Sequence, residues 1–305
     1  MAAPQSRLNI YDAVAANRWR TALLITVFTG ILVALGYVVG EVFTPGGGLA
    51  MVPAALGLSG VSATASYFAG DRLVLAQSQA RELAPGEAPQ LRNIVETLSI
   101  GLGIPPPRIY LIDDTAPNAF ATGRDPKHAS IAVTRGLIEK LDRTEQEGVI
   151  AHELSHVGNH DIRVMLLVTV MVGTIALLSD WMFRSFAWGG GGRRGRDRGG
   201  GGMILIIALA LAILTPIIAT LIQLAVSRQR EYLADASGAL LTRYPPGLAS
   251  ALRKIAADKE ALEVANKATA SLYFANPLKD APRAMDGLFD THPPIAERIR
   301  RLEAM

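Results

Sequence analysis

Four apolar stretches divide the 305-residue chain, and they fall into two pairs. The first pair is residues 21–40, which carry no charge, and residues 49–70, which follow the turn sequence TPGGG. About 20 apolar residues are needed to cross the roughly 30 Å of a bilayer's hydrocarbon core. The pattern therefore predicts a transmembrane hairpin within residues 1–78. The first stretch is longer than the apolar part of a signal peptide and no clear cleavage site follows, so it is interpreted as an uncleaved anchor.

The second pair is residues 164–183 and 203–226. The first of these has only 16 uncharged residues and reaches a spanning length when residues 180–183 are included, whereas the second is uncharged throughout. Residues 184–202 between them are rich in Gly and Arg, which is typical of a disordered loop. Their glycines lack the strand, lysine and helix context of a phosphate-binding loop. Residues 162–228 are thus predicted to form a second apolar hairpin.

The remaining segments, residues 79–161 and 229–305, are predicted to form two parts of one catalytic domain. RIYLIDD and ASIAVTRG have the β-branched and apolar character of strands, and GRDPKH between them favours a turn, so we expect a small sheet. A helix should follow, because Thr144 and Glu147 have capping-box spacing ahead of an apolar stripe. The predicted fold class is a mostly α integral membrane protein with a small α+β domain.

Composition agrees with membrane embedding. Half of the residues are hydrophobic, 19% are charged and the mean hydropathy is +0.27, a high value for a soluble domain. The absence of cysteine excludes a disulfide framework, cysteine-ligated zinc and a thiol nucleophile. The net charge is +3, but no predicted helix carries a sustained basic stripe with interleaved aromatic residues. A nucleic-acid partner is therefore not expected.

The distribution of arginine predicts the orientation in the membrane. Basic residues gather in cytoplasmic loops, and the loop between the first two apolar runs has none. The later loop of residues 184–202 is arginine-rich and would lie outside after an even number of crossings. Either the early helices dominate the orientation, which we favour, or the second hairpin does not fully span the membrane. Both termini are expected to be cytoplasmic. The arginines that flank the first hairpin are Arg7, Arg18, Arg20, Arg72, Arg81 and Arg92.

The sequence AHELSHVGNHD carries the candidate chemistry. On a helix, His152 and His156 lie one turn apart on the same face, about 6 Å along the axis, so both imidazoles can bind one Zn²⁺. Glu153 would then lie beside the metal as a general base for an attacking water. His160 is eight residues from His152, about 12 Å along a helix, and is rejected as a third ligand.

Glu231, in REYLAD, is the candidate third ligand. It would complete a His, His, Glu set and leave a fourth position for water. Asp235, one turn later, would accept a hydrogen bond from the second nitrogen of a ligand histidine. A Glu and an Asp four residues apart are also common on a solvated helix face. Because an apolar hairpin separates His156 from Glu231, both segments should return to the same side of the membrane, with the metal within about 10–20 Å of its surface.

The chain carries four motifs, PNAFATG, HELSH, REYLAD and THPP, in this order. In these motifs and their order it resembles, over nearly its whole length, the HtpX group of membrane metalloproteases, relatives of the CAAX prenyl proteases. The resemblance implies a zincin-like catalytic domain and a zinc endopeptidase with one Zn²⁺ per chain. It further implies a multi-pass protein of the bacterial inner membrane with its active site facing the cytoplasm. The implied partners are the lipid bilayer and misfolded, damaged or unfolded polypeptides, in stress response and quality control.

Residue roles follow from the same resemblance. It makes His152, His156 and Glu231 the zinc ligands, Glu153 the base and Asp235 a residue that orients a ligand. Substrate would add as a further strand along an edge strand. His292, in THPP, looks like the histidine that stabilises the tetrahedral oxyanion, although a lone His before Pro-Pro is also an ordinary loop residue. The residues of the implied edge strand are Asn118, Ala119, Phe120 and Ala121.

Other functions fit these residues less well than a protease does. A non-catalytic membrane scaffold with a structural metal site would need four protein ligands. A transporter would need ionisable or helix-breaking residues at mid-membrane depth, and Pro216 alone is thin support. A prenyl-protein processing enzyme would need more apolar segments to enclose a lipidated tail. Residues 271–277 fit either a cover over the cleft or a core segment, and His128 is expected to be exposed.

Overall fold

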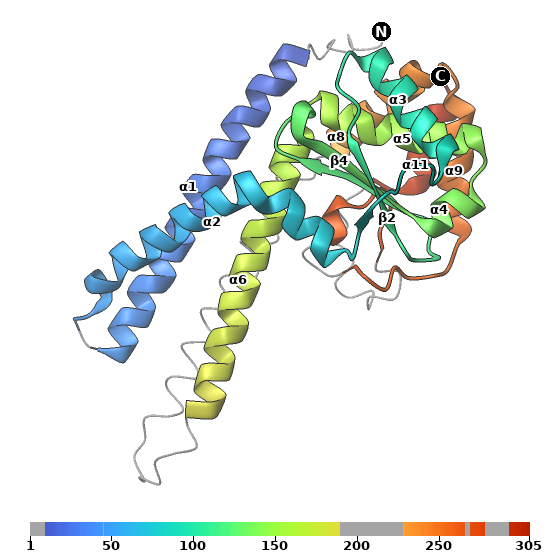
Figure 1. Ribbon diagram of the computed structural model, residues 1–305. Coiled ribbons are helices and arrows are strands. Elements are labelled where there is room, and N and C mark those ends of the chain that lie inside the picture. Colours follow the sequence, from blue (N-terminus) through green and yellow to red (C-terminus); the bar gives the residue numbers. More distant parts are fainter. Residues whose placement is uncertain (1–9, 45, 190–227, 266–268, 278–292) are drawn as a thin grey trace.

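Three long helices extend away from a domain built on a small sheet (Figure 1). The computed structural model describes residues 10–44, 46–189, 228–265, 269–277 and 293–305. The long helices are α1 (Ile10–Phe43), α2 (Gly48–Gln77) and α6 (Asp161–Gly189). Gly46 and Gly47 precede α2 directly, in the turn sequence that predicted a tight connection from α1.

The two candidate membrane spans found among the described residues are Thr21–Glu41 in α1 and Gly48–Gln77 in α2. Only 22% and 17% of their most apolar windows are buried, which distinguishes them from core helices of a soluble domain. The helices approach closely, since a Cβ on Gly36 would lie 2.9 Å from the Cβ of Ala55. Small residues at such a contact are typical of helix pairs in membranes.

The first half of α6 packs against the hairpin formed by α1 and α2. Leu167, Met171 and Ile175 of α6 share a buried cluster with Phe28 and Leu32 of α1. The predicted return run, residues 203–226, and most of the Gly/Arg-rich loop lie outside the described residues. The second hairpin therefore stays a prediction.

The sheet has four strands in the order β1-β2-β4-β3. Strand β2 (Arg108–Ile112) pairs parallel to β4 (Ala129–Thr134) and antiparallel to the short β1 (Arg81–Glu82). Strand β3 (Ala119–Gly123) pairs antiparallel to β4 and lies at the sheet edge. The predicted small sheet is confirmed, and the predicted turn holds a short 3₁₀ helix, η1 (Pro126–His128).

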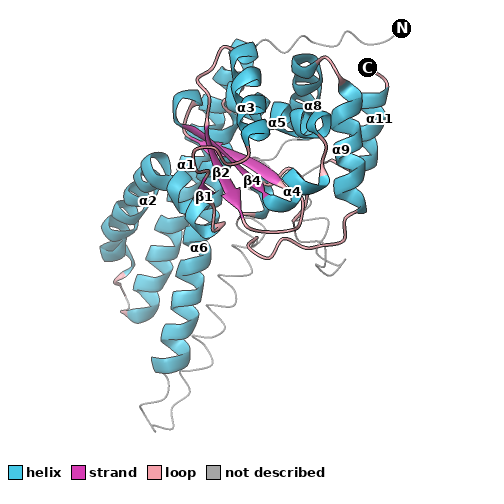
Figure 2. Ribbon diagram, turned by 45° about the vertical axis from the view of Figure 1, so that its right-hand side comes forward, coloured by secondary structure: helices cyan, strands magenta, loops and turns pink. Residues whose placement is uncertain are grey.

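Both faces of the sheet are buried, because successive side chains along each strand point to opposite faces and both faces are covered. Ile109, Leu111 and Ile131 contact one cluster with α3 and α5, whereas Ile112 and Phe120 belong to a second cluster with the end of α2 and the start of α6. The sheet thus joins the helical domain to the long helices (Figure 2). The remaining elements are α3 (Pro89–Leu102), α4 (Arg135–Lys140), α5 (Arg143–Gly158), α8 (Arg228–Thr242), α9 (Pro245–Ala257), η2 (Ala270–Leu272) and α11 (Ile295–Glu303).

Helix α5 runs through the middle of the domain and is buried from Gly148 to Val157. Its predicted cap was wrong by two residues. The capping box is formed by Asp142 and Glu145, not by Thr144 and Glu147: Asp142 has an extended backbone, accepts from the Glu145 N–H and donates its own N–H to the Glu145 carboxylate. The stronger cap two residues earlier starts the helix there.

Candidate metal centre

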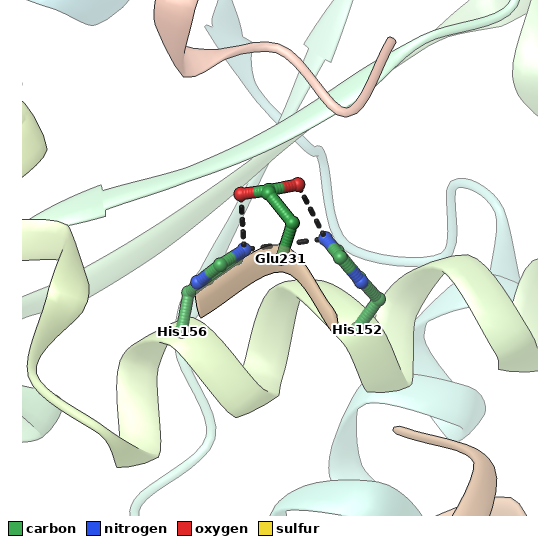
Figure 3. Close-up of side chains that lie close together, drawn as sticks. All are labelled: His152, His156 and Glu231. Carbon is green, nitrogen blue, oxygen red and sulfur yellow. Dashed lines mark hydrogen bonds and ion pairs between the residues drawn. The ribbon is translucent and has the colours of Figure 1, made fainter. Parts of the chain in front are cut away.

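Three side chains from two helices converge on one point (Figure 3). Helix α5 supplies His152 and His156, and α8 supplies Glu231. The two Nε2 atoms are 3.2 Å apart. Nε2 of His152 lies 3.7 Å from one Glu231 carboxylate oxygen, and Nε2 of His156 lies 3.5 Å from the other. All three side chains are buried.

This donor set fits a metal ion. Ligand atoms bound at about 2.1 Å to a tetrahedral ion are separated by about 3.4 Å. The two Nε2 atoms are close to this spacing, and one ligand atom from each of the three residues lies within 4.8 Å of the others. Two imidazoles and one carboxylate suit a borderline divalent cation such as Zn²⁺. Three protein ligands among the described residues leave one position for water or substrate, as in catalytic sites.

Close packing of α8 on α5 brings Glu231 to the histidines. A Cβ on Gly238 would lie 3.0 Å from the backbone nitrogen of His152, so a larger residue at this position would push α8 away. Gly238 stands two helical turns after Glu231 and therefore fixes the distance between the helices near the site.

His152 is oriented by a buried ion pair. Its Nδ1 lies 2.9 Å from Oδ1 of Asp235, and Asp235 accepts two hydrogen bonds from Arg298, at 2.7 and 2.8 Å. The Arg298 side chain is fully buried, and its guanidinium also lies over the ring of Phe274, 4.8 Å from the centroid. A bidentate pair of this kind fixes the carboxylate, and the carboxylate fixes the imidazole.

His156 has an equivalent partner. Its Nδ1 lies 3.2 Å from Oδ2 of Asp161, the first residue of α6, and the other Asp161 oxygen lies 3.5 Å from Nη1 of Arg230. The Nδ1 atom of each candidate ligand histidine thus contacts a carboxylate, and that carboxylate contacts an arginine. Such outer hydrogen bonds hold each ring with Nε2 free for a metal.

Three ionisable side chains at the site, those of His152, His156 and Asp235, have shifted pKa values. Burial lowers the pKa of His152 to about 4, although Asp235 opposes the shift. Burial acts in the same direction on His156, but Asp161, Glu231 and Glu153 outweigh it and raise the pKa to about 9. Burial would raise the pKa of Asp235, yet Arg298 and His152 hold it at about 2. In the metal-free chain, burial thus favours the neutral imidazole that would hold a metal at His152, whereas the carboxylates around His156 favour its protonated form.

Glu153 lies next to the cluster and is 2% exposed. Burial, with a smaller contribution from Glu231, raises the pKa of this carboxyl to about 8, while His156 and a hydrogen bond from the Ala121 N–H oppose the shift. The hydrogen bond ties Glu153 to the edge strand β3. A carboxyl with a pKa near neutrality is suited to accept and return a proton.

Strand β3 reaches the site, but part of its edge is already occupied. The Ala119 carbonyl accepts a 2.8 Å hydrogen bond from the Phe274 N–H, and the Asn118 side chain bonds to both the carbonyl and the N–H of Ala275. The side chains from Leu272 to Ala275 are buried. Residues 271–277 are therefore core and also border the site, since Phe274 contacts the His152 ring edge to face at 5.0 Å.

The other two described histidines lie apart from the cluster. His160 lies in the turn between α5 and α6 with a φ of 60°, so the helix ends before it, and it is not in the metal cluster. His128 is half exposed and its Nδ1 lies 2.8 Å from Asp125. His292 lies outside the described residues, and its predicted role stays a prediction.

Sequence reasoning missed Asp161, Arg230 and Arg298. Arg298 had a recognisable signal, because it interrupts the apolar stripe that Ile295, Ile299 and Leu302 form on one side of α11. An arginine on such a stripe points into the protein and needs a buried anion. Asp161 stands at the start of an apolar helix, where an acidic residue is common, and gave no such signal.

The comparisons with known proteins agree with this geometry. A family model described as Peptidase family M48 matches residues 85–305. The chain is 47% identical over 295 residues to the Protease HtpX homolog of Dictyoglomus thermophilum, covering 97% of this chain and 94% of that protein. It is 44% identical over 297 residues to the Protease HtpX homolog of Tropheryma whipplei, covering 97% and 98%. The crystal structure of S. mikatae Ste24p is similar with a TM-score of 0.50 and 19% identity over 96% of this chain and 67% of that one, a likeness of fold alone.

Proposed function

Since the chain belongs to peptidase family M48 and is a membrane metalloprotease, we propose that it is a zinc-dependent endopeptidase that cleaves misfolded or damaged membrane proteins. The observation that carries the proposal is the buried cluster of His152, His156 and Glu231, with Glu153 beside it and hydrogen-bonded to an edge strand. We further propose a zincin-like catalytic domain interrupted by a second membrane hairpin.

His152, His156 and Glu231 would hold one Zn²⁺, and Asp235 and Asp161 would keep the two imidazoles in place. A bound Zn²⁺ supplies a Lewis acid that polarises the scissile carbonyl and makes water acidic enough to attack at neutral pH. Glu153 takes a proton from the attacking water and passes it to the leaving amine. His292 would donate to the oxyanion that forms on the carbonyl.

The direct test is cleavage of casein that carries no prenyl group by the full-length protein in mild detergent. We expect cleavage that stops with a chelator and returns when stoichiometric Zn²⁺ is added. A requirement for a prenylated substrate would favour the prenyl-protein processing enzyme instead. Bound zinc without cleavage of casein or of any unfolded membrane protein would favour the scaffold.

We propose that substrate adds as an extended strand along the free part of β3, near Ala121, where Glu153 is anchored. Pairing further along, at Asn118 and Ala119, requires Phe274 to move, because its N–H occupies the Ala119 carbonyl. The test is a cleaved peptide N-methylated at one backbone position at a time. Because alternate amides of a strand face the same neighbour, we expect cleavage to slow roughly fivefold at every second position near the scissile bond. Equal rates at all positions would contradict strand addition.

We also propose that the protein lies in the bacterial inner membrane with its catalytic domain in the cytoplasm, as the arginine distribution favours. The chain has no cysteine, so single cysteines can report topology. We expect an impermeant maleimide to label Thr44→Cys, in the exposed turn after α1, in intact spheroplasts. Arg253→Cys, on exposed α9, should be labelled only after lysis. The reverse pattern would overturn the orientation.

A further inference from the structure

A recess separate from the metal centre lies where α2 meets the sheet. It has a volume of about 150 Å³ and is lined by Tyr67, Phe68, Asp71 and Arg72 of α2, by Arg108 at the start of β2, and by Arg124 and His128 around η1. Three arginines against one aspartate give the lining a net charge of +2 with His128 neutral. None of these residues has a place in the proposed proteolytic chemistry.

Two of the arginines, Arg72 and Arg124, are weakly paired or unpaired among the described residues and can bind an anionic ligand. Arg108 lies 3.5 Å from Asp71, which balances it. Arg124 lies 3.7 Å from Asp125, at the limit of an ion pair, and His128 also contacts that carboxylate at 2.8 Å. For Arg72 no carboxylate lies within 4.0 Å in the part of the chain that is described. With Asp125 counted, three arginines against two aspartates leave the recess a net charge of +1, and Arg72 is the arginine without a described carboxylate partner.

The aromatic side chains give the recess a second, apolar component. Tyr67 and Phe68 pack edge to face with centroids 4.9 Å apart, and Phe68 is 61% exposed. The Arg124 guanidinium lies over both rings, 5.9 Å from Tyr67 and 5.6 Å from Phe68. Arg163 of α6 stands 5.9 Å from the Tyr67 ring and donates to the Arg124 carbonyl, which fixes the turn above the rings.

The position along α2 places this recess at the membrane surface. The apolar run of α2 ends at Gly70, and Asp71 and Arg72 are its first charges. Trp19, two residues before the uncharged run of α1, is 71% exposed, and Tyr67, near the end of the apolar run of α2, is 37% exposed. Exposed Trp and Tyr at the ends of apolar runs are typical of the bilayer interface.

We propose that this recess binds the phosphate group of an anionic membrane lipid. Arginine donates paired hydrogen bonds to phosphate oxygens, and basic pockets beside membrane helices bind lipid head groups. Arg72 and Arg124 contact the phosphate, while Tyr67 and Phe68 contact the glycerol and upper acyl region. The bound lipid would sit between α2 and the η1 turn and tie the catalytic domain to the membrane surface.

The test is native mass spectrometry of the full-length protein in neutral detergent with sub-saturating phosphatidylglycerol or phosphatidylcholine of the same acyl chains. We expect one preferentially retained phosphatidylglycerol, and roughly tenfold weaker retention in Arg72→Gln/Arg124→Gln. The control Arg253→Gln/Arg300→Gln removes the same charge from exposed positions of α9 and α11 and should retain lipid like the wild type. Arg72→Gln alone, at an exposed residue, should give an intermediate loss in a folded protein.

Equal retention in the wild type and the double variant would overturn the proposal. Inorganic phosphate distinguishes the two sources of the same chemistry. Failure of millimolar phosphate to displace the lipid supports a lipid site, whereas displacement by phosphate together with equal retention of both lipids would assign the recess to free phosphate and overturn the lipid. Casein cleavage in detergent should be unchanged in all these variants, so that loss of lipid binding is separable from failure of the proposed proteolysis.

Discussion

Replacing Glu153 with Gln is expected to lower kcat for peptide hydrolysis about 10²- to 10⁴-fold without loss of the metal. The amide keeps the size of the side chain but cannot accept the proton of the attacking water. Burial raises the pKa of the Glu153 carboxyl to about 8, so in the metal-free chain it is protonated at neutral pH and Gln is a close mimic.

The folded-state pKa of Glu153 is above the unfolded value, so Glu153 stabilises the metal-free fold at low pH and loses this contribution as the pH rises through about 8.

The matched control is Glu231→Gln, which changes the same functional group on the neighbouring helix. It should lose both the metal and the activity, because Glu231 supplies one of three ligand atoms. Elemental analysis for zinc and initial cleavage rates separate the two variants. A Glu153→Gln protein that keeps more than about a tenth of the wild-type kcat would remove Glu153 from the proposed mechanism.

Replacing Arg298 with Met is expected to destabilise the metal-free fold by about 3–5 kcal/mol, because Asp235 is then buried without its cation. Asp235→Asn in the same background should recover part of this loss, since the neutral amide needs no counter-charge. The measurement is a double-mutant cycle on thermal unfolding of the purified protein.

The control for that cycle is Arg253→Met, which breaks the exposed ion pair with Glu303 and should change stability by less than about 0.5 kcal/mol. If Arg298→Met and Asp235→Asn were additive, the two residues would not be energetically coupled. Arg298 would then act by packing on Phe274 alone.

The parts of the site that sequence predicts are those fixed by local geometry. Helical periodicity alone places His152 and His156 on one face, and β-branched and apolar runs around a turn-rich segment predict β2 and β4. Glu231 required one further argument, that an apolar hairpin returns the chain to the same membrane side. The structure brings Glu231 and Asp235 to the two histidines, although the return run of that hairpin is not among the described residues.

The parts that sequence did not predict depend on contacts between distant segments. Arg298 pairs with Asp235 only because α11 packs on α8 and α9, and Phe274 reaches Ala119 across 155 positions of the chain. The cap of α5 was missed for a local reason: both Asp142 and Thr144 are competent caps, and the burial of Glu145 decides between them. Propensity ranks such alternatives weakly when tertiary packing differs between them.

The long separation of Arg298 and His152 in the sequence has a consequence for biosynthesis. They stand 146 positions apart, with the long apolar helix α6 between them, so the partner of Asp235 is translated well after both the HELSH helix and α6. Domains fold largely from the N-terminus during synthesis, but this centre cannot close until α11 has left the ribosome. We therefore expect α1 and α2 to enter the membrane before the centre can hold its metal firmly, so that proteolytic activity begins only once the protease is anchored.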